Sequence, residues 1–242
     1  MKIRSLLTVL FISIFSSAFA ACGNEMENMG QQYPDSVSTA VRLLYMGQAS
    51  LRIETEHEKV IYIDPYAGNQ YDLAADLILV THEHFDHNDV SKVQKRNPTC
   101  RIIRAKDAII DGVHQKFHWE NVTIEAVEAG YNRFHDVQKC VGFVLTFGNG
   151  RKVYISGDTS ITEQMRSMSD MHIDYAFLCT DGVYNMGNEE AEQAAEMIKA
   201  EHTIPYHNSV SNNGDMFDRE AADRFNVDGK LILLPGQTLI IE

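Results

Sequence analysis

Short runs of apolar and β-branched residues recur along most of this 242-residue chain, and they predict a strand-rich protein. The clearest run follows Asp76, where Leu-Ile-Leu-Val indicates a buried strand. Between two other runs, Gly148-Asn149-Gly150 is typical of a hairpin turn. Strands are expected at 41–46, 50–55, 59–63, 76–81, 101–104, 122–127, 141–147, 151–156, 173–178, 203–206, 231–234 and 238–241.

Four segments have a helical pattern: 88–96, 160–168, 188–200 and 217–226. The pattern at 188–200 is the best defined, because Asn188 can cap its start and two glutamates follow where the helix dipole favours negative charge. Its apolar residues form one stripe, made of Ala191, Ala194, Ala195 and Ile198. Strands with interspersed helices fit two sheets packed together and covered by helices outside.

The N-terminus has the pattern of an export signal. Lys2 and Arg4 precede an apolar stretch at 6–15, and Ala18-Phe19-Ala20 offers small residues for cleavage. The stretch is short for a membrane span, which needs about 20 residues. Residues 1–21 are therefore expected to be a signal peptide, 22–38 a flexible tether and 39–242 a single domain.

Cys22, directly after this segment, leaves two destinations open. Lipidation of Cys22 would make the protein a bacterial lipoprotein, anchored to the membrane only through that lipid, and the polar tether favours this reading. Otherwise the protein is soluble in the periplasm or secreted. Both readings place it outside the cytoplasm.

Charge and cysteine content narrow the function classes. The apolar fraction of 44% and charged fraction of 23% are those of an ordinary globular domain. Removing residues 1–21 takes away two positive charges and no acids, so the formal charge moves from −13 to −15, which disfavours a nucleic-acid partner. Cys100, Cys140 and Cys179 lack Cys-x-x-Cys spacing, and their disulfide pairing is left open; Cys179 ends an apolar run and is expected to pack in the core.

The segment 81–87 concentrates potential metal ligands directly after the buried strand. It contains His82, His84, Asp86 and His87. Imidazoles and carboxylates suit zinc, iron or manganese better than calcium or magnesium. A His-x-His pair in extended geometry directs both rings to one side, and the following Asp-His pair reaches a second point, so one loop could begin two adjacent metal sites. The alternative is a polar surface loop that is rich in histidine.

His82-x-His84-x-Asp86-His87 resembles the signature of the metallo-β-lactamase-fold superfamily of metal-dependent hydrolases. Further segments match this superfamily in order, namely 44–50 with 60–65, 129–135, 154–159 and 204–207. The resemblance spans about residues 41 to 242, and it implies an α+β fold, a four-layer αβ/βα sandwich. Within the superfamily the chain is similar to the branch of lactonase-like and N-acyl-phosphatidylethanolamine phospholipase D-like hydrolases. It departs from many relatives at Gln48, where they carry histidine, and at Asp181-Gly182, in a variable segment.

The resemblance also implies a site for two divalent metal ions, zinc first, with manganese or iron as alternatives. His82, His84 and His135 would hold one ion, Asp86, His87 and His207 the other, and Asp158 would bridge them. The ions would share a hydroxide as the nucleophile. Asp86 would orient this hydroxide and pass its proton to the leaving group.

Local sequence alone allows other roles for the distant ligands. His135 would be a surface histidine, Asp158 a turn residue that caps a helix, and His207 a half-buried histidine. The remaining histidines are expected to be surface or packing residues: His57, His114, His118, His172 and His202.

The sequence also suggests residues that would support the metal site or line a substrate pocket. Asp64 is expected to support the site through hydrogen bonds. Asp181, Tyr184 and Asn185 fall between a strand and the helix at 188–200, and they are expected to line a substrate pocket, although such a loop is equally compatible with plain surface.

These features predict an exported metal-dependent hydrolase that acts on an ester, lactone or phosphodiester in a small-molecule or lipid-like substrate. A β-lactam is a further option in that compartment. The alternative is a non-catalytic metal-binding surface lipoprotein that retains the fold. The oligomeric state is left open.

Overall fold

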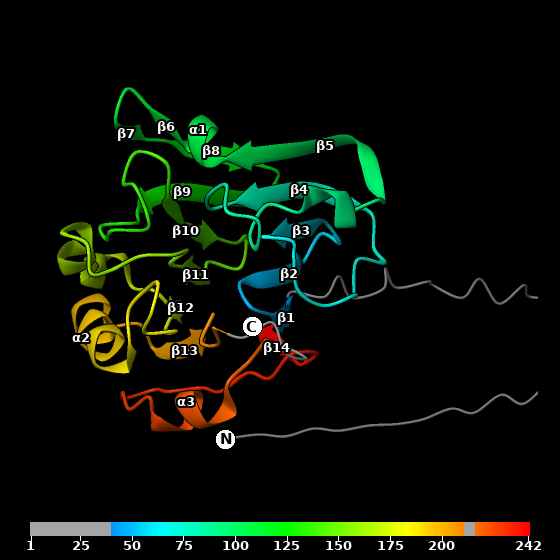
Figure 1. The fold of residues 1–242 in the computed structure, drawn as a ribbon. Coiled ribbons are helices and arrows are strands. Elements are labelled where there is room, and N and C mark those ends of the chain that lie inside the picture. Colours follow the sequence, from blue (N-terminus) through cyan, green and yellow to red (C-terminus); the bar gives the residue numbers. More distant parts are fainter. Residues whose placement is uncertain (1–39, 211–215) are drawn as a thin grey trace, which may run out of the picture. The chain divides into compact units, whose positions relative to one another are not determined.

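Two six-stranded sheets organise the structure: one contains β1–β5 and the C-terminal strand β14, the other β8–β13. The computed structural model describes residues 40–210 and 216–242; the expected signal peptide 1–21, tether 22–38 and Cys22 lie outside the described residues. The first sheet has the order β14 (Thr238–Ile241), β1 (Val41–Gly47), β2 (Ser50–Glu54), β3 (Val60–Ile63), β4 (Ala75–Val80) and β5 (Arg96–Arg104). The second has the order β13 (His202–Tyr206), β12 (Tyr175–Cys179), β11 (Lys152–Ile155), β10 (Val141–Thr146), β9 (Val122–Glu128) and β8 (Lys116–Trp119). Figure 1 shows the two sheets side by side.

Each sheet combines antiparallel and parallel pairs. In the first sheet β14, β1, β2 and β3 pair antiparallel, whereas β3, β4 and β5 are parallel. In the second sheet β8 to β11 are antiparallel, and β11, β12 and β13 are parallel. A two-stranded hairpin, β6 (Ile109–Ile110) and β7 (Val113–His114), stands apart from both.

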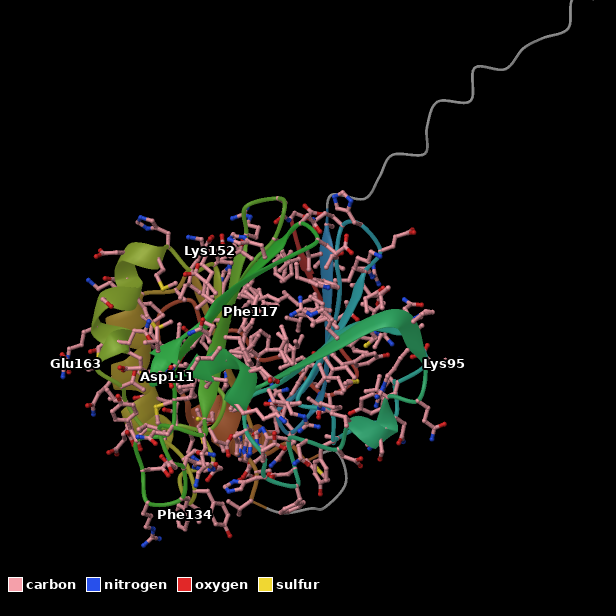
Figure 2. All side chains as sticks on the ribbon, turned by 90° about the horizontal axis from the view of Figure 1, so that it is seen from above. Lys95, Asp111, Phe117, Phe134, Lys152 and Glu163 are labelled. Carbon is pink, nitrogen blue, oxygen red and sulfur yellow. The ribbon has the colours of Figure 1, made fainter. Side chains whose placement is uncertain are left out.

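The main core lies between the sheets, and a smaller apolar cluster covers the outer face of the first sheet. Successive side chains of a strand point to opposite faces: Leu43 and Tyr45 of β1 belong to the main core, whereas Leu44 and Met46 belong to the outer cluster. Figure 2 shows side chains filling the space between the sheets, with Phe117 of β8 among them.

The layers outside the two sheets differ: helices cover the second sheet, and mainly loop segments cover the first. α2 (Asn188–Ile198) packs against the 3-10 helix η2 (Gln164–Met171), and both lie on the outer side of the second sheet (Figures 1 and 2). The first sheet is covered by the segment between β3 and β4 and by the 3-10 turn η1 (Val90–Lys92). Two short helices, α1 (Ala105–Ala108) and α3 (Arg219–Arg224), complete the fold. The expected α+β sandwich is thus confirmed, with helices mainly on one side.

Several expected elements are wrong. Instead of a helix at 88–96 the chain has only η1, because Val90 and Val93 are its sole apolar residues and Pro98 favours extended backbone before it. The helix expected at 160–168 begins later, since the Thr162 hydroxyl accepts a hydrogen bond from the Met165 amide at 3.3 Å and precedes η2.

In the C-terminal half, further elements differ from those expected from the sequence. No strand forms at 231–234: Lys230 makes one isolated bridge to Thr203, and Pro235 follows without an amide proton. Asn188 does not cap α2; Gly187 is the capping residue, and the Asn188 amide donates to Ala221 O of α3 at 2.8 Å. The strands β6, β7 and β8 were not expected.

Other expectations hold. Ala191, Ala194, Ala195 and Ile198 form the buried face of α2, and Cys179 is fully buried. Cys100, Cys140 and Cys179 are free thiols. Among the described residues, no helix is long and apolar enough to cross a membrane.

One end of the sandwich collects the loops that bear the expected ligands. The loops follow the carboxyl ends of β4, β9, β11, β12 and β13. Figure 2 places Phe134, after β9, and Lys152, the first residue of β11, at opposite ends of the molecule. The ligand loops therefore meet at the end marked by Phe134.

Candidate metal centre

The histidine-rich loop is fixed at its start by a buried carboxylate. Thr81 directly follows β4, and Asp64 directly follows the parallel strand β3. The Thr81 amide donates to Asp64 Oδ1 at 2.7 Å, and its hydroxyl donates to Oδ2 at 2.6 Å. Asp64 is fully buried, so these bonds hold the loop in one position relative to the sheet.

Asp158 lies at the centre of the expected ligand set. Its Oδ1 is 3.3 Å from His87 Nε2 and 3.4 Å from His207 Nε2. Its Oδ2 is 3.3 Å from His135 Nε2 and 4.0 Å from His82 Nε2. One carboxylate therefore faces four imidazoles, two on each oxygen.

Seven side chains converge around this carboxylate. Three overlapping groups have ligand atoms within 4.8 Å of one another: His82 with His84 and His135; Asp86 with His87 and His207; and His82 with His87 and Asp158. The first two groups correspond to the two expected ion sites, and the third joins them. We call these residues the histidine–aspartate cluster: His82, His84, Asp86, His87, His135, Asp158 and His207.

The cluster fits divalent metal ions. His82 Nε2, His87 Nε2 and Asp158 Oδ1 are buried and make no hydrogen bond. Buried polar atoms normally have a partner, and these three point toward the same small space. Imidazole and carboxylate donors suit zinc, manganese or iron.

Hydrogen bonds on the far side of the rings orient two of the imidazoles. His87 Nδ1 lies 2.9 Å from Asp64 Oδ2, and His135 Nδ1 lies 3.1 Å from Asn132 Oδ1. Donation from Nδ1 to these oxygens leaves Nε2 with a free lone pair directed into the cluster. Such outer partners fix the ring and raise its basicity as a ligand.

Burial sets the charge of the histidines. It lowers the pKa of His82 well below its ordinary value and also lowers the pKa of His84. Both rings are therefore neutral at pH 7, which is the form that binds metal. Burial acts on His87 in the same direction, but the Asp158 and Asp64 carboxylates outweigh it and raise the pKa of His87 well above the ordinary value. The centre of the cluster thus favours positive charge.

The carboxylates are correspondingly acidic. Burial opposes ionisation of Asp158, yet His207 and His87 hold the pKa of Asp158 well below its usual range. His207 and His87 likewise lower the pKa of Asp86 against the effect of burial. Both groups are charged near neutral pH and available as ligands or as a base.

A cavity of about 450 Å³ opens beside the cluster. Five residues of the cluster line it: His84, Asp86, His135, Asp158 and His207. The other lining residues are Gln48, Phe85, Phe134, Tyr184, Ser209 and Val210. The cluster is therefore reachable by a ligand of moderate size.

Of the three residues expected at the pocket, only Tyr184 lines it. The Asp181 side chain is fully buried, with Oδ2 at 3.5 Å from His207 Nδ1, and Oδ1 accepts the Tyr184 amide at 2.7 Å. The side-chain amide of Asn185 donates from Nδ2 to Asp181 Oδ2 at 2.7 Å. Asp181 and Asn185 thus support His207 from behind, because the carboxylate turns toward the backbone of its own loop.

The sequence did not indicate that Phe85 and Phe134 line the cavity, or which side chains contact the ligands. Phe85 follows His84, and Phe134 precedes His135. An apolar residue next to a ligand on a loop has no core to enter, and that adjacency was the available signal. Gln48 stood out in the sequence as a departure from many relatives, but its contact through Nε2 with Asp86 Oδ2 at 3.0 Å was not predicted. His57, His118 and His172 are exposed, and with the half-buried His114 and His202 they stay outside the cluster.

Known proteins are similar to this chain in sequence and architecture. A family model described as the beta-lactamase superfamily domain matches residues 42–207. A UPF0173 metal-dependent hydrolase of Bacillus licheniformis is 30% identical over 199 residues, which cover 70% of this chain and 86% of the relative.

Two solved structures extend the likeness. A candidate zinc-dependent hydrolase of the metallo-beta-lactamase superfamily from Thermotoga maritima is 26% identical, with a TM-score of 0.54 over 72% of this chain and 78% of that one. A metallo hydrolase from the archaeon Ignicoccus hospitalis is 20% identical, with a TM-score of 0.68 over 84% of this chain and 99% of that one. The latter likeness concerns the fold.

Proposed function

We propose, on the premise that this chain belongs to the beta-lactamase superfamily and is a metal-dependent hydrolase, that it cleaves an ester, lactone or phosphodiester bond at the histidine–aspartate cluster. One observation carries the proposal: the buried Asp158 carboxylate stands between two sets of imidazoles, and the inward nitrogens of His82 and His87 lack hydrogen-bond partners. The open cavity beside the cluster admits a substrate.

The chain offers two ligand sets that share a carboxylate. His82, His84 and His135 would hold one ion, Asp86, His87 and His207 the other, and Asp158 would contact both. When bound, two divalent ions, zinc or alternatively manganese or iron, supply Lewis acidity and lower the pKa of a water to about 7. Three imidazoles at one site leave a position open, as in catalytic zinc sites.

Asp86 is placed to handle the proton of the attacking water. Its side chain is 18% exposed, lines the cavity and lies 3.6 Å from His207 Nε2 through Oδ2. The low pKa of Asp86 keeps the carboxylate charged, so it accepts a hydrogen bond from a water and orients it for attack. A carboxylate of low pKa is a weak base, so Asp86 holds the proton only in passing, as it moves from the attacking water to the leaving oxygen.

The experiment is reconstitution followed by an activity panel. The protein is stripped with a chelator, reloaded separately with zinc, manganese or iron(II), and assayed for bound metal and for turnover. The panel contains 4-nitrophenyl acetate, δ-valerolactone and bis(4-nitrophenyl) phosphate. The proposal expects about two ions per chain and turnover that depends on them.

His84→Ala is the test variant, because His84 is a cluster residue and yet exposed, so its loss leaves the core intact. Turnover should fall at least about 100-fold, the upper end of the loss seen when even an outer partner of a metal ligand is removed. His57→Ala, an exposed histidine outside the cluster, is the matched control and should retain wild-type turnover. Two bound ions without turnover on the panel would instead favour a non-catalytic metal-binding protein.

A further inference from the structure

Three aromatic side chains stand exposed at the cavity beside the histidine–aspartate cluster. Phe85 is 68% exposed, Tyr184 49% and Phe134 37%. All three line the cavity that has His84 and His207 in its wall. Large apolar side chains gathered in solvent at one place mark a binding surface. We call these three residues the aromatic rim.

Contacts between rings hold the rim in place. Phe134 and Tyr184 meet edge to face with centroids 5.1 Å apart, although they lie on loops after different strands. Phe85 meets Tyr66 edge to face at 5.7 Å. The Arg133 guanidinium lies 4.4 Å from the Phe134 centroid. A rim that is already ordered loses little conformational freedom when a ligand binds; Figure 2 shows Phe134 at the outer end of the molecule.

The described lining of the cavity offers no side-chain cation to an anionic group of a substrate. Among its described lining residues there is no Lys or Arg, whereas Asp86 and Asp158 contribute carboxylates. Sites that recognise phosphate or carboxylate groups normally supply Arg or Lys for hydrogen bonds beyond any metal. Arg133 stacks on Phe134 and is not part of the lining. The bound ions serve the reacting oxygen, and the walls then offer aromatic surface and no second cation.

Cavity size sets the scale of the substrate. A volume of about 450 Å³ lies in the range of small-molecule sites. It accommodates one ring together with the reacting group.

We infer that this cavity takes an uncharged carboxylic ester or lactone whose apolar part is an aromatic ring, in preference to a phosphodiester. The ring packs on Phe134 and Tyr184 while the carbonyl faces the cluster. Water adds to the carbonyl carbon, the bond to the leaving oxygen breaks, and the products are a carboxylic acid and an alcohol. The inference rests on the proposed function and specifies its substrate class.

Matched esters test the inference with metal-loaded protein and acid release as the readout. Benzyl acetate and ethyl acetate share the scissile ester and differ in the ring, and 4-carboxybenzyl acetate adds one negative charge to the ring. Bis(4-nitrophenyl) phosphate provides the phosphodiester. The kcat/KM of benzyl acetate should exceed that of ethyl acetate about tenfold, as expected for burial of one ring, and should exceed that of 4-carboxybenzyl acetate by a similar factor.

Variants of the rim locate the effect. Phe134→Ala and Tyr184→Ala should each lower kcat/KM for benzyl acetate about fivefold to tenfold through KM, and should change the value for ethyl acetate less than about twofold. Phe134→Leu keeps apolar volume without the ring and should fall between. Ile110→Ala, at an exposed apolar residue on β6 outside the cavity lining, is the control and should match the wild type.

The outcomes separate the inference from the function beneath it. Metal-dependent turnover with equal kcat/KM for benzyl and ethyl acetate, or with a benzyl preference that survives in Phe134→Ala, overturns the inference and leaves the hydrolase intact. A higher kcat/KM for bis(4-nitrophenyl) phosphate than for benzyl acetate would also overturn the inference and leave the hydrolase intact. Absence of metal-dependent turnover on every substrate overturns the proposed function and the inference together.

Discussion

The Gln48 side chain shows how one amide can hold the Asp86 carboxylate in place. Its Nε2 lies 3.0 Å from both Asp86 Oδ2 and His207 Nε2. Gln48 is itself fixed, because its backbone carbonyl accepts hydrogen bonds from the Tyr45 hydroxyl and the His207 backbone amide, each at 3.0 Å. The Gln48 amide therefore donates to Asp86 from a rigid position.

Replacing this amide with an apolar group of similar size should impair the chemical step. Gln48→Met removes the donor, and loss of a hydrogen bond to a charged group costs about 1.5 kcal/mol or more. We expect kcat to fall about tenfold while KM stays within about twofold, measured by steady-state kinetics on protein loaded with metal. Gln94→Met, at an exposed site away from the cavity, is the control; an unchanged kcat in Gln48→Met would show that the amide does not position Asp86.

At the scale of single residues, the sequence predicted which residues form the cluster better than it predicted the side chains that contact them. His82, His84, Asp86 and His87 are recognisable because they crowd one loop after a buried strand. The direction of Asp181 could not be predicted, since it depends on three amides of its own turn that lie close only after folding.

Among the elements, the link between β11 and Asp158 is tightly constrained. Gly157 has φ of +61°, and a Cβ there would lie 2.8 Å from Val141 O and 3.0 Å from Thr81 Cβ. The close approach of β10 and the histidine loop at this point places Asp158 against its imidazoles. Only glycine meets both the backbone and the space requirement.

Gly157→Ala should therefore destabilise the fold and the metal site together. Strained backbone and overpacking each cost about 1–3 kcal/mol, so we expect a loss of at least about 2 kcal/mol in chemical denaturation and a reduced metal content. Gly150→Ala is a matched control, because Gly150 has φ of +85° and nothing within 4 Å of the added Cβ. Equal losses in the two variants would contradict the role of close packing at Gly157.

Elements with a strong pattern were predicted and those set by long-range pairing were not. The apolar stripe of α2 ends at Ile198, within two residues of the expected end at 200. β8 escaped prediction because Lys116–Trp119 is short, has only Trp119 buried, and pairs only with β9. Such a strand is defined by its neighbour and not by its own sequence.

In the whole molecule, the cluster connects the two sheets. The loop after β4 of the first sheet supplies His82, His84, Asp86 and His87. Loops after β9, β11 and β13 of the second sheet supply His135, Asp158 and His207. A metal ion held by ligands from both sheets would join them at one end of the sandwich. This arrangement followed from the family resemblance, because the residue pattern alone predicted only a mixed α and β protein.

Metal removal should consequently lower the stability of the whole fold. A ligand at 100 times its dissociation constant stabilises the native state by about 2.7 kcal/mol, and in a domain of this size each kcal/mol corresponds to roughly 2–4 °C in Tm. We expect chelation to lower Tm by about 5–10 °C, with recovery when zinc is restored, measured by differential scanning calorimetry. His84→Ala should show a smaller shift on chelation, and His57→Ala the full shift, because only His84 belongs to the cluster. A Tm that is the same with and without chelator, in protein shown to have carried two ions per chain, would mean that the cluster does not join the sheets through metal.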